Sequence, residues 1–182
     1  MHDFKCNPEM EITGQTLLAY VDNLRVDIIR PMSEKHGMTT DIDPEKWYPL
    51  QPVLDVLKEL SKSSNAAENL VALGVKIAEY GVEPEDIIAA PLSVVLEHWQ
   101  DHMDYNFRNG DPGKVITEKV HDKFYKVTQI NLFPDDLCYG LAYGFARSRL
   151  PLGTNFKVWY EDSDNRIDEG GGDKTVICIE WE

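Results

Sequence analysis

The sequence predicts an α+β fold: an N-terminal helical layer packed on a small antiparallel sheet, with one C-terminal helix between hairpins. Three observations predict it. Apolar residues recur at helical spacing up to about Phe107, and alternation begins after the turn-rich segment 109–113. One more helical stretch then separates the first pair of strands from the last. Helices followed by strands are typical of α+β domains.

The composition fits a single folded domain, residues 1–182, that binds neither nucleic acid nor anionic membranes. Of 182 residues, 42% are hydrophobic, and the formal net charge is −14, so polyanionic surfaces would repel the protein. The three cysteines lie far apart without a CxxC spacing, which indicates neither a zinc knuckle nor a disulfide framework and favours a reduced, cytoplasmic setting. The N-terminus lacks the apolar run of a signal peptide, and no stretch approaches the roughly 20 apolar residues of a membrane span.

The helical part is expected to cover residues 12–109, after a loose arm or added edge segment at 1–11. Leu17, Val21, Leu24 and Ile28 recur at helical spacing, and Pro31 is expected to end or kink their helix.

Cap-like sequences predict where later helices begin. Asp43-Pro44-Glu45 is typical of a helix start, although Pro49 and Pro52 predict a bent or delayed one. Asn65 and Glu68 have the spacing of a capping box. Two more starts are expected at Glu83-Pro84-Glu85-Asp86 and at Leu92.

Residues 114–182 are expected to form a hairpin, a helix and a second pair of strands. The helix contains Gly140 and Gly144, which share one face and allow close packing, and we expect it to lie on the sheet. The predicted elements are the strands Lys114–Val120 and Phe124–Ile130, the helix Pro134–Leu150, and the strands Asn155–Glu161 and Thr175–Trp181.

His98 and His102 are candidate ligands for a metal or haem, because four-residue spacing puts both imidazoles on one side of a helix. Trp99 stands where a metalloprotease helix has its glutamate, so that chemistry is not indicated. Histidines on the flank of an apolar face also serve as ordinary boundary residues, and both interpretations stay open.

Other polar groups near the late helix can be interpreted either as functional groups or as ordinary structural residues. Cys138 is either a nucleophile or a small buried hydrophobe. Tyr143 and Arg147, one turn apart, either hold a carboxylate or acidic partner, or pair locally. The acidic glycine-rich segment Asp168–Asp173 lacks the residues of a P-loop. The carboxylates within Asp162–Asp168 could bind calcium but lack the spacing of an EF-hand. No catalytic residues are indicated.

The C-terminal third resembles the 4-vinyl reductase domain, and more distantly the H-NOX haem domain and the TRAPP vesicle-tethering subunits. The resemblance rests on Cys138-Tyr-Gly-Leu-Ala-Tyr-Gly144 after a hairpin, on Phe156-Lys-Val-Trp-Tyr160, on Glu169-Gly-Gly-Gly-Asp173 and on Cys178. It implies a small apolar ligand in the first family. In the second it implies haem held by a histidine before the sheet and a Tyr-x-Ser-x-Arg motif, which this sequence lacks. In the third it implies dimerisation around a hydrophobic channel.

We therefore expect a non-catalytic small-molecule or sensory domain with a pocket between helices and sheet. The alternatives are a haem or gas sensor using His98 or His102, and a structural module that forms a homodimer or binds a signalling partner. The aliphatic candidates equally suit plain core positions. The expected ligand-binding residues are Leu96, Trp99, His102, Met103, Cys138, Leu141, Tyr143, Phe145 and Arg147.

Overall fold

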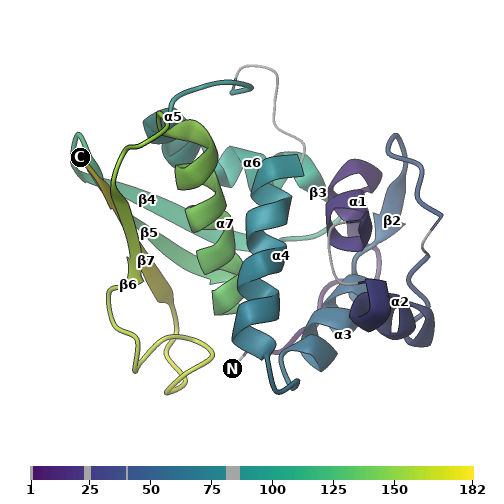
Figure 1. The fold of residues 1–182 in the computed structure, drawn as a ribbon. Coiled ribbons are helices and arrows are strands. Elements are labelled where there is room, and N and C mark those ends of the chain that lie inside the picture. Colours follow the sequence, from purple (N-terminus) through teal and green to yellow (C-terminus); the bar gives the residue numbers. More distant parts are fainter. Residues whose placement is uncertain (1, 23–25, 40, 81–86) are drawn as a thin grey trace.

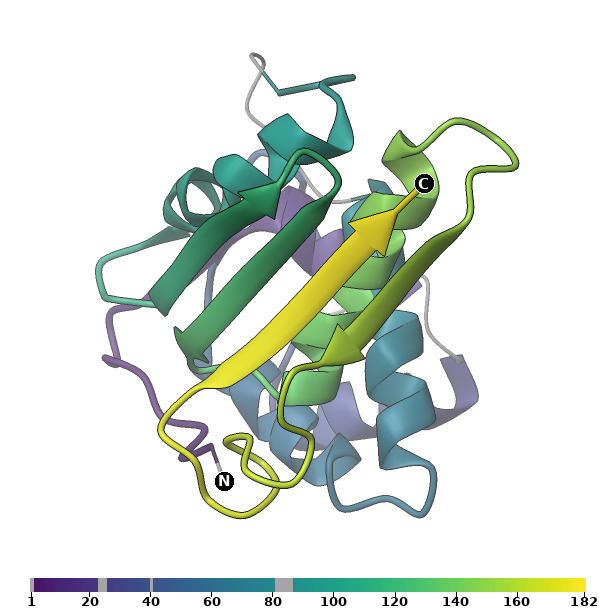
Figure 2. The same cartoon turned by 90° about the vertical axis from the view of Figure 1, so that its left-hand side faces the viewer.

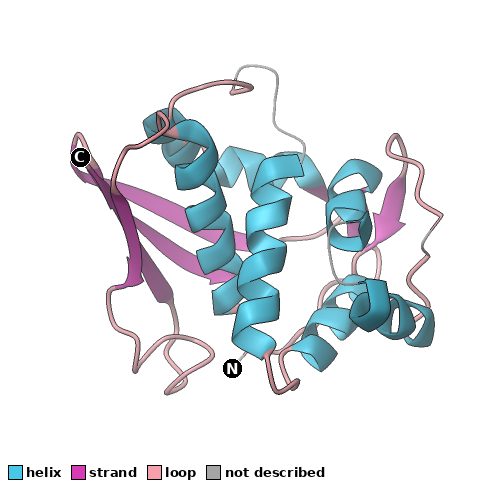
Figure 3. Cartoon of the chain, in the orientation of Figure 1, coloured by secondary structure: helices cyan, strands magenta, loops and turns pink. Residues whose placement is uncertain are grey.

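The computed structural model describes residues 2–22, 26–39, 41–80 and 87–182. A four-stranded sheet forms one side of the molecule, two long helices stand beside it, and shorter helices with a second small sheet form the other side (Figures 1 and 3). The elements are β1 (Glu11–Thr13), α1 (Gly14–Asp22), α2 (Val26–Lys35), β2 (Trp47–Pro49), α3 (Gln51–Leu60), α4 (Ala66–Tyr80), α5 (Leu92–Glu97), α6 (Trp99–Asn106), β3 (Phe107–Arg108), β4 (Gly113–His121), β5 (Phe124–Asn131), α7 (Asp135–Arg149), β6 (Phe156–Tyr160) and β7 (Thr175–Trp181).

The four-stranded sheet has the order β4-β5-β7-β6, and all its pairs are antiparallel. Helices cover one face of it, and the opposite face is turned toward the viewer in Figure 2. Alternation along β5 decides which side chains meet the helices: Tyr125, Val127 and Gln129 are buried, whereas Ile130 is exposed. The predicted α+β class, the hairpin and the strand Thr175–Trp181 are confirmed.

The glycines of α7 face α4, not the sheet. A Cβ on Gly140 would lie 2.3 Å from the carbonyl oxygen of Val71, and one on Gly74 would lie 2.2 Å from that of Leu137. A Cβ on Gly144 would lie 2.6 Å from the Cβ of Ala78. The prediction of close packing is confirmed at α4, and α7 also lies on the sheet as expected, since its Tyr139 hydroxyl donates to the Val158 carbonyl oxygen of β6 at 2.9 Å. Spacing identifies a small-residue face without identifying what covers it.

The N-terminal segment is integrated into the fold and is not a loose arm. Phe4 and Met10 are buried, and β1 is the central strand of a second sheet with the order β2-β1-β3. Gln51 extends this attachment, because its side-chain amide donates to the Phe4 carbonyl oxygen at 2.9 Å and its Oε1 accepts the Cys6 N–H at 3.2 Å.

Two helix boundaries lie beyond their local start or stop signals. The helix expected from Asp43 has the delayed start that Pro49 and Pro52 predict: it begins at Gln51, and residues 47–49 pair with β1. Pro31 lies inside α2, which continues to Lys35. The predictions for Leu24 and for the start at 83–86 lie outside the described residues, as does the side chain of Ile28. Among the helices described, none is long and apolar enough to cross a membrane.

Candidate functional site

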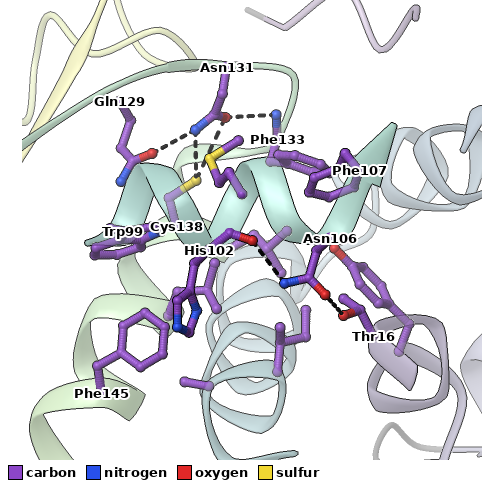
Figure 4. Close-up of a pocket in the computed structure, with 16 residues that line it drawn as sticks. Thr16, Trp99, His102, Asn106, Phe107, Gln129, Asn131, Phe133, Cys138 and Phe145 are labelled. Carbon is purple, nitrogen blue, oxygen red and sulfur yellow. Dashed lines mark hydrogen bonds between the residues drawn. The ribbon is translucent and has the colours of Figure 1, made fainter. Parts of the chain in front are cut away.

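A cavity of about 70 Å³ lies where α1, α4, α6 and α7 meet the end of β5 (Figure 4). Its wall is mainly apolar and aromatic, with a few amides and hydroxyls, as in small-molecule sites generally. The lining residues are Thr16, Tyr20, Ile77, Ala78, Trp99, His102, Met103, Asn106, Phe107, Gln129, Asn131, Phe133, Leu137, Cys138, Leu141 and Phe145.

Two amides from β5 form one side of the cavity. Because Gln129 and Asn131 are two residues apart, both side chains project toward the helices. The Asn131 Nδ2 donates to the Gln129 Oε1 at 2.6 Å, and the Asn131 Oδ1 accepts the Phe133 N–H at 2.9 Å (Figure 4). The Gln129 side chain is 2% exposed, and its Nε2 has no hydrogen-bond partner among the described residues.

A second polar group, centred on Asn106, joins α6 to α1. The Asn106 Nδ2 donates to the His102 carbonyl oxygen at 2.8 Å, one helical turn earlier. Its Oδ1 accepts hydrogen bonds from the hydroxyls of Thr16 and Thr13. The bonds hold the C-terminal end of α6 against the start of α1, and they leave this group largely occupied by protein partners.

His102 lies in the aromatic part of the wall. It is 8% exposed, and its ring meets that of Phe145 edge to face at 5.9 Å. Phe145 also meets Trp99 edge to face at 5.2 Å. The imidazole is therefore positioned by aromatic packing between α6 and α7.

The structure brings together six of the nine expected ligand-binding residues. Trp99, His102, Met103, Cys138, Leu141 and Phe145 all line the cavity.

The other candidates lie elsewhere. Leu96 is fully buried in the core, and Tyr143 packs on Phe156 at 5.1 Å. Arg147 is half exposed and forms an ion pair with Glu79. His98 is also half exposed and forms a hydrogen bond with Asp101 at 2.6 Å, and it is not among the residues that line the cavity.

The amides of the wall were missed from the sequence. Gln129 and Asn131 continue the inward-facing phase set by Tyr125 and Val127 on β5, and polar residues in that phase were the available signal. Asn106 sits on α6 next to Phe107, where helical periodicity alone gives no reason to select it.

The described wall of the cavity contains no aspartate, glutamate, lysine or arginine, and its one histidine is His102. Burial raises the pKa of the Cys138 thiol and of the Tyr20 phenol well above their ordinary values, so both stay protonated near neutral pH. A thiol held in this form is a poor nucleophile, and the plain interpretation of Cys138 is favoured.

A separate cluster of His2, Asp135 and Asp168 has the residue types of a metal site, with one ligand atom of each within 4.8 Å of the others. The two carboxylates of this cluster already accept hydrogen bonds from protein groups. Thr175 Oγ1 donates to Asp135 Oδ1 at 2.6 Å, and the two aspartates accept each other's backbone N–H. The cluster is accounted for as a link between the N-terminus, α7 and β7.

The fold of this chain is similar to that of H-NOX domains among solved structures. A double variant of the Tt H-NOX domain matches with a TM-score of 0.69 at 14% identity, covering 94% of this chain and 95% of that one. An oxygen-binding H-NOX domain related to soluble guanylate cyclases matches with a TM-score of 0.67 at 15% identity, and the match covers 94% of this chain and 95% of that one. An H-NOX protein from S. oneidensis in the Fe(II) ligation state matches with a TM-score of 0.67 at 13% identity, and the match covers 94% of this chain and 96% of that one.

These matches support the H-NOX part of the expected resemblance, and at such identities they concern the fold alone. No family model matches the sequence, and the search of curated proteins finds no match.

The cavity as it stands does not fit haem, the group that the H-NOX resemblance implies. Its volume of about 70 Å³ is far below the roughly 300–1,000 Å³ of sites for drug-sized ligands. Haem carries two carboxylates, and no lysine or arginine lines the described wall. On β5 the inward-facing residues at two-residue spacing are Val127, Gln129 and Asn131, so a Tyr-x-Ser-x-Arg motif is absent there. Of the two features that the H-NOX resemblance implies for holding haem, only the histidine on the helix before the sheet is present at the cavity, as His102.

Proposed function

We propose that this chain is a non-catalytic sensory or binding domain with an H-NOX-like fold, and that it takes a small, uncharged and largely apolar molecule in the cavity between α6 and α7. The single observation that carries the proposal is the cavity itself. It is lined by Trp99, Phe145 and Met103 on one side and by Gln129 and Asn131 on the other. Apolar walls with a few convergent polar groups are typical of such sites.

The size of the cavity sets the size of the ligand. An engineered apolar cavity of about 150 Å³ binds benzene, and this one has about half that volume. A molecule of a few non-hydrogen atoms therefore fits without rearrangement. The described wall offers no aspartate, glutamate, lysine or arginine to pair with a charged ligand. This supports an uncharged ligand, because burying an unpaired charge costs several kcal/mol or more.

Haem is the second candidate, and one observation favours it. His102 lies on the helix before the sheet and faces the cavity of a fold that resembles H-NOX domains. Haem would require the aromatic wall around Phe145 to open widely.

Absorption spectroscopy separates the two candidates. The protein is purified from cells supplied with a haem precursor and also mixed with haem after purification. Small-ligand binding without haem predicts no Soret band at one haem per chain in either sample. A stoichiometric Soret band that persists in His98→Ala and is lost in His102→Ala would establish the haem candidate instead.

Xenon tests the cavity directly, because it is small, apolar and uncharged. We expect xenon pressure to shift the amide resonances of residues in the cavity wall, while those of the 161–174 loop stay in place. Leu141→Phe, which enlarges a wall side chain, should weaken the shift, and Leu152→Phe, at a fully exposed position, should not. Equal shifts in all three proteins would contradict the proposed site.

A further inference from the structure

The Gln129 side chain carries a donor that the described protein leaves unused. Its Oε1 accepts from Asn131 at 2.6 Å, and its Nε2 is buried without a hydrogen-bond partner among the described residues. The side chain is 2% exposed and lines the cavity. A buried donor without an acceptor is costly, and such groups in native proteins are usually satisfied by a water or a ligand.

The other amides of the wall are occupied. Asn131 uses its Oδ1 on the Phe133 N–H and its Nδ2 on Gln129, and Asn106 binds the His102 carbonyl oxygen and the Thr16 hydroxyl. Among the amides of the described wall, Gln129 is the one whose nitrogen makes no hydrogen bond to the described residues. A molecule that meets it must supply an acceptor.

We propose that the ligand is a small neutral molecule with an apolar body and one hydrogen-bond acceptor, of the carbonyl or ether class, and that Gln129 Nε2 donates to that acceptor. The inference rests on the proposed function, since it requires the cavity to admit a ligand. It adds that Gln129 is a specificity-determining residue, which discriminates between molecules of equal size by their acceptor.

The charge and the hydrogen-bonding groups of the wall narrow the chemical class of the ligand. A carboxylate would bring a negative charge to a wall with no lysine or arginine among its described residues. A pure hydrocarbon would fill the space but leave the Gln129 donor unsatisfied. A neutral oxygen acceptor satisfies the donor and adds no charge.

Acetone and isobutene test the inference, because they share a shape and differ in whether an oxygen or a methylene group is presented. Each is titrated into ¹⁵N-labelled protein, and dissociation constants are taken from amide shifts of the cavity wall. Gln129→Leu removes the donor at similar volume, and Gln15→Leu is the matched control at an exposed position. We expect Gln129→Leu to weaken acetone binding about threefold to tenfold, as for the net loss of one hydrogen bond. Isobutene should bind Gln129→Leu as tightly as wild type, or more tightly.

The outcomes separate the inference from the proposed function. If neither probe binds, the proposed cavity function fails. If both bind and Gln129→Leu changes them equally, the cavity function stands and the role of Gln129 is wrong. If the side-chain amide protons of Gln129 show an NMR cross-peak to a bound water, and acetone does not displace that water, the inference is likewise overturned. Gln129→Met provides a second donor-free side chain should the leucine variant lose its dispersed spectrum.

Discussion

Asp135 and Asp168 bind each other reciprocally through their backbones. The Asp135 N–H donates to the Asp168 Oδ2 at 2.9 Å, and the Asp168 N–H donates to the Asp135 Oδ2 at 2.8 Å. His2 joins them, with its Nε2 3.4 Å from the Asp135 Oδ1. The arrangement ties the first residue of α7 to the long connection between β6 and β7, 33 residues away in sequence, and draws the N-terminal segment against both.

Asp135→Asn should destabilise the protein by about 2–3 kcal/mol, because an amide replaces a buried carboxylate that accepts several charge-assisted hydrogen bonds. Asp135 is 1% exposed, and Thr175 Oγ1 and the Asp168 N–H both donate to it. Urea unfolding measures the loss. Asp173→Asn, an exposed change in the same connection, should cost little. Equal effects of the two substitutions would contradict the assigned role.

Stability should also fall in acid, and Asp135 should contribute to the fall. Burial raises the pKa of its carboxyl, but the bonds from His2, Thr175 and the Asp168 backbone outweigh burial and hold the pKa below its usual value. A depressed folded pKa gives stability that is present above the unfolded pKa of about 3.9 and is lost as pH falls through the folded value. The free energy of unfolding, measured from pH 6 to pH 2.5, should decline less steeply in Asp135→Asn than in wild type. Parallel curves would rule the contribution out.

Gly140→Ala should destabilise the protein by about 1–3 kcal/mol or more, as overpacking does. Its Cβ would meet the Val71 carbonyl oxygen at 2.3 Å and the Val71 Cα at 2.9 Å, and both are backbone atoms that cannot rotate away. At an open helical site the same change would stabilise by about 1 kcal/mol, so the sign of the effect is diagnostic. Thermal and urea unfolding measure it, with Ser148→Ala at an exposed position of α7 as control.

Arg147→Ala should change stability by no more than about 1 kcal/mol and leave probe binding in the cavity unaltered. Arg147 is half exposed and pairs with Glu79, and exposed ion pairs contribute little. The double variant with Glu79→Ala gives the coupling energy. Weaker acetone binding by Arg147→Ala would return this residue to the site and contradict its placement outside the cavity.

The three thiols should differ in reactivity. Burial raises the pKa of all three, and Cys138 and Cys178 are buried while Cys6 is partly exposed. A thiol reagent at pH 8 should therefore modify Cys6 first, and Cys6→Ser should remove that fast phase. The other two should react together with global unfolding. Rapid labelling of Cys138 in the folded protein would mean that the cavity wall opens readily.

Much of the fold was predictable because local patterns suffice for it. The strand Thr175–Trp181 and the hairpin before α7 followed from alternation and turn residues, and α7 followed from helical spacing. The late start of α3 was predicted from its prolines, but the strand β2 before it was not, because residues 47–49 pair with β1, a strand far away in the chain. Tertiary pairing overrode a good local cap signal there.

The residues of the candidate site likewise divide into those that the sequence predicted and those that it did not. Trp99, His102 and Phe145 were selected from the apolar faces of two helices, and they do line the cavity. Gln129 was missed, since a polar residue near the end of a strand resembles many surface residues until the packed layer above it is known.

The sequence by itself determined the α+β class, the order of elements after residue 113 and the small-residue face of α7, because each depends on residues close together in the chain. Only the tertiary structure decided that this face meets α4, that His2 reaches Asp135, and that Gln129 borders a cavity with an unused donor. Those relationships join segments that are distant in sequence, and their geometry is set by the packing of whole elements and not by any local spacing.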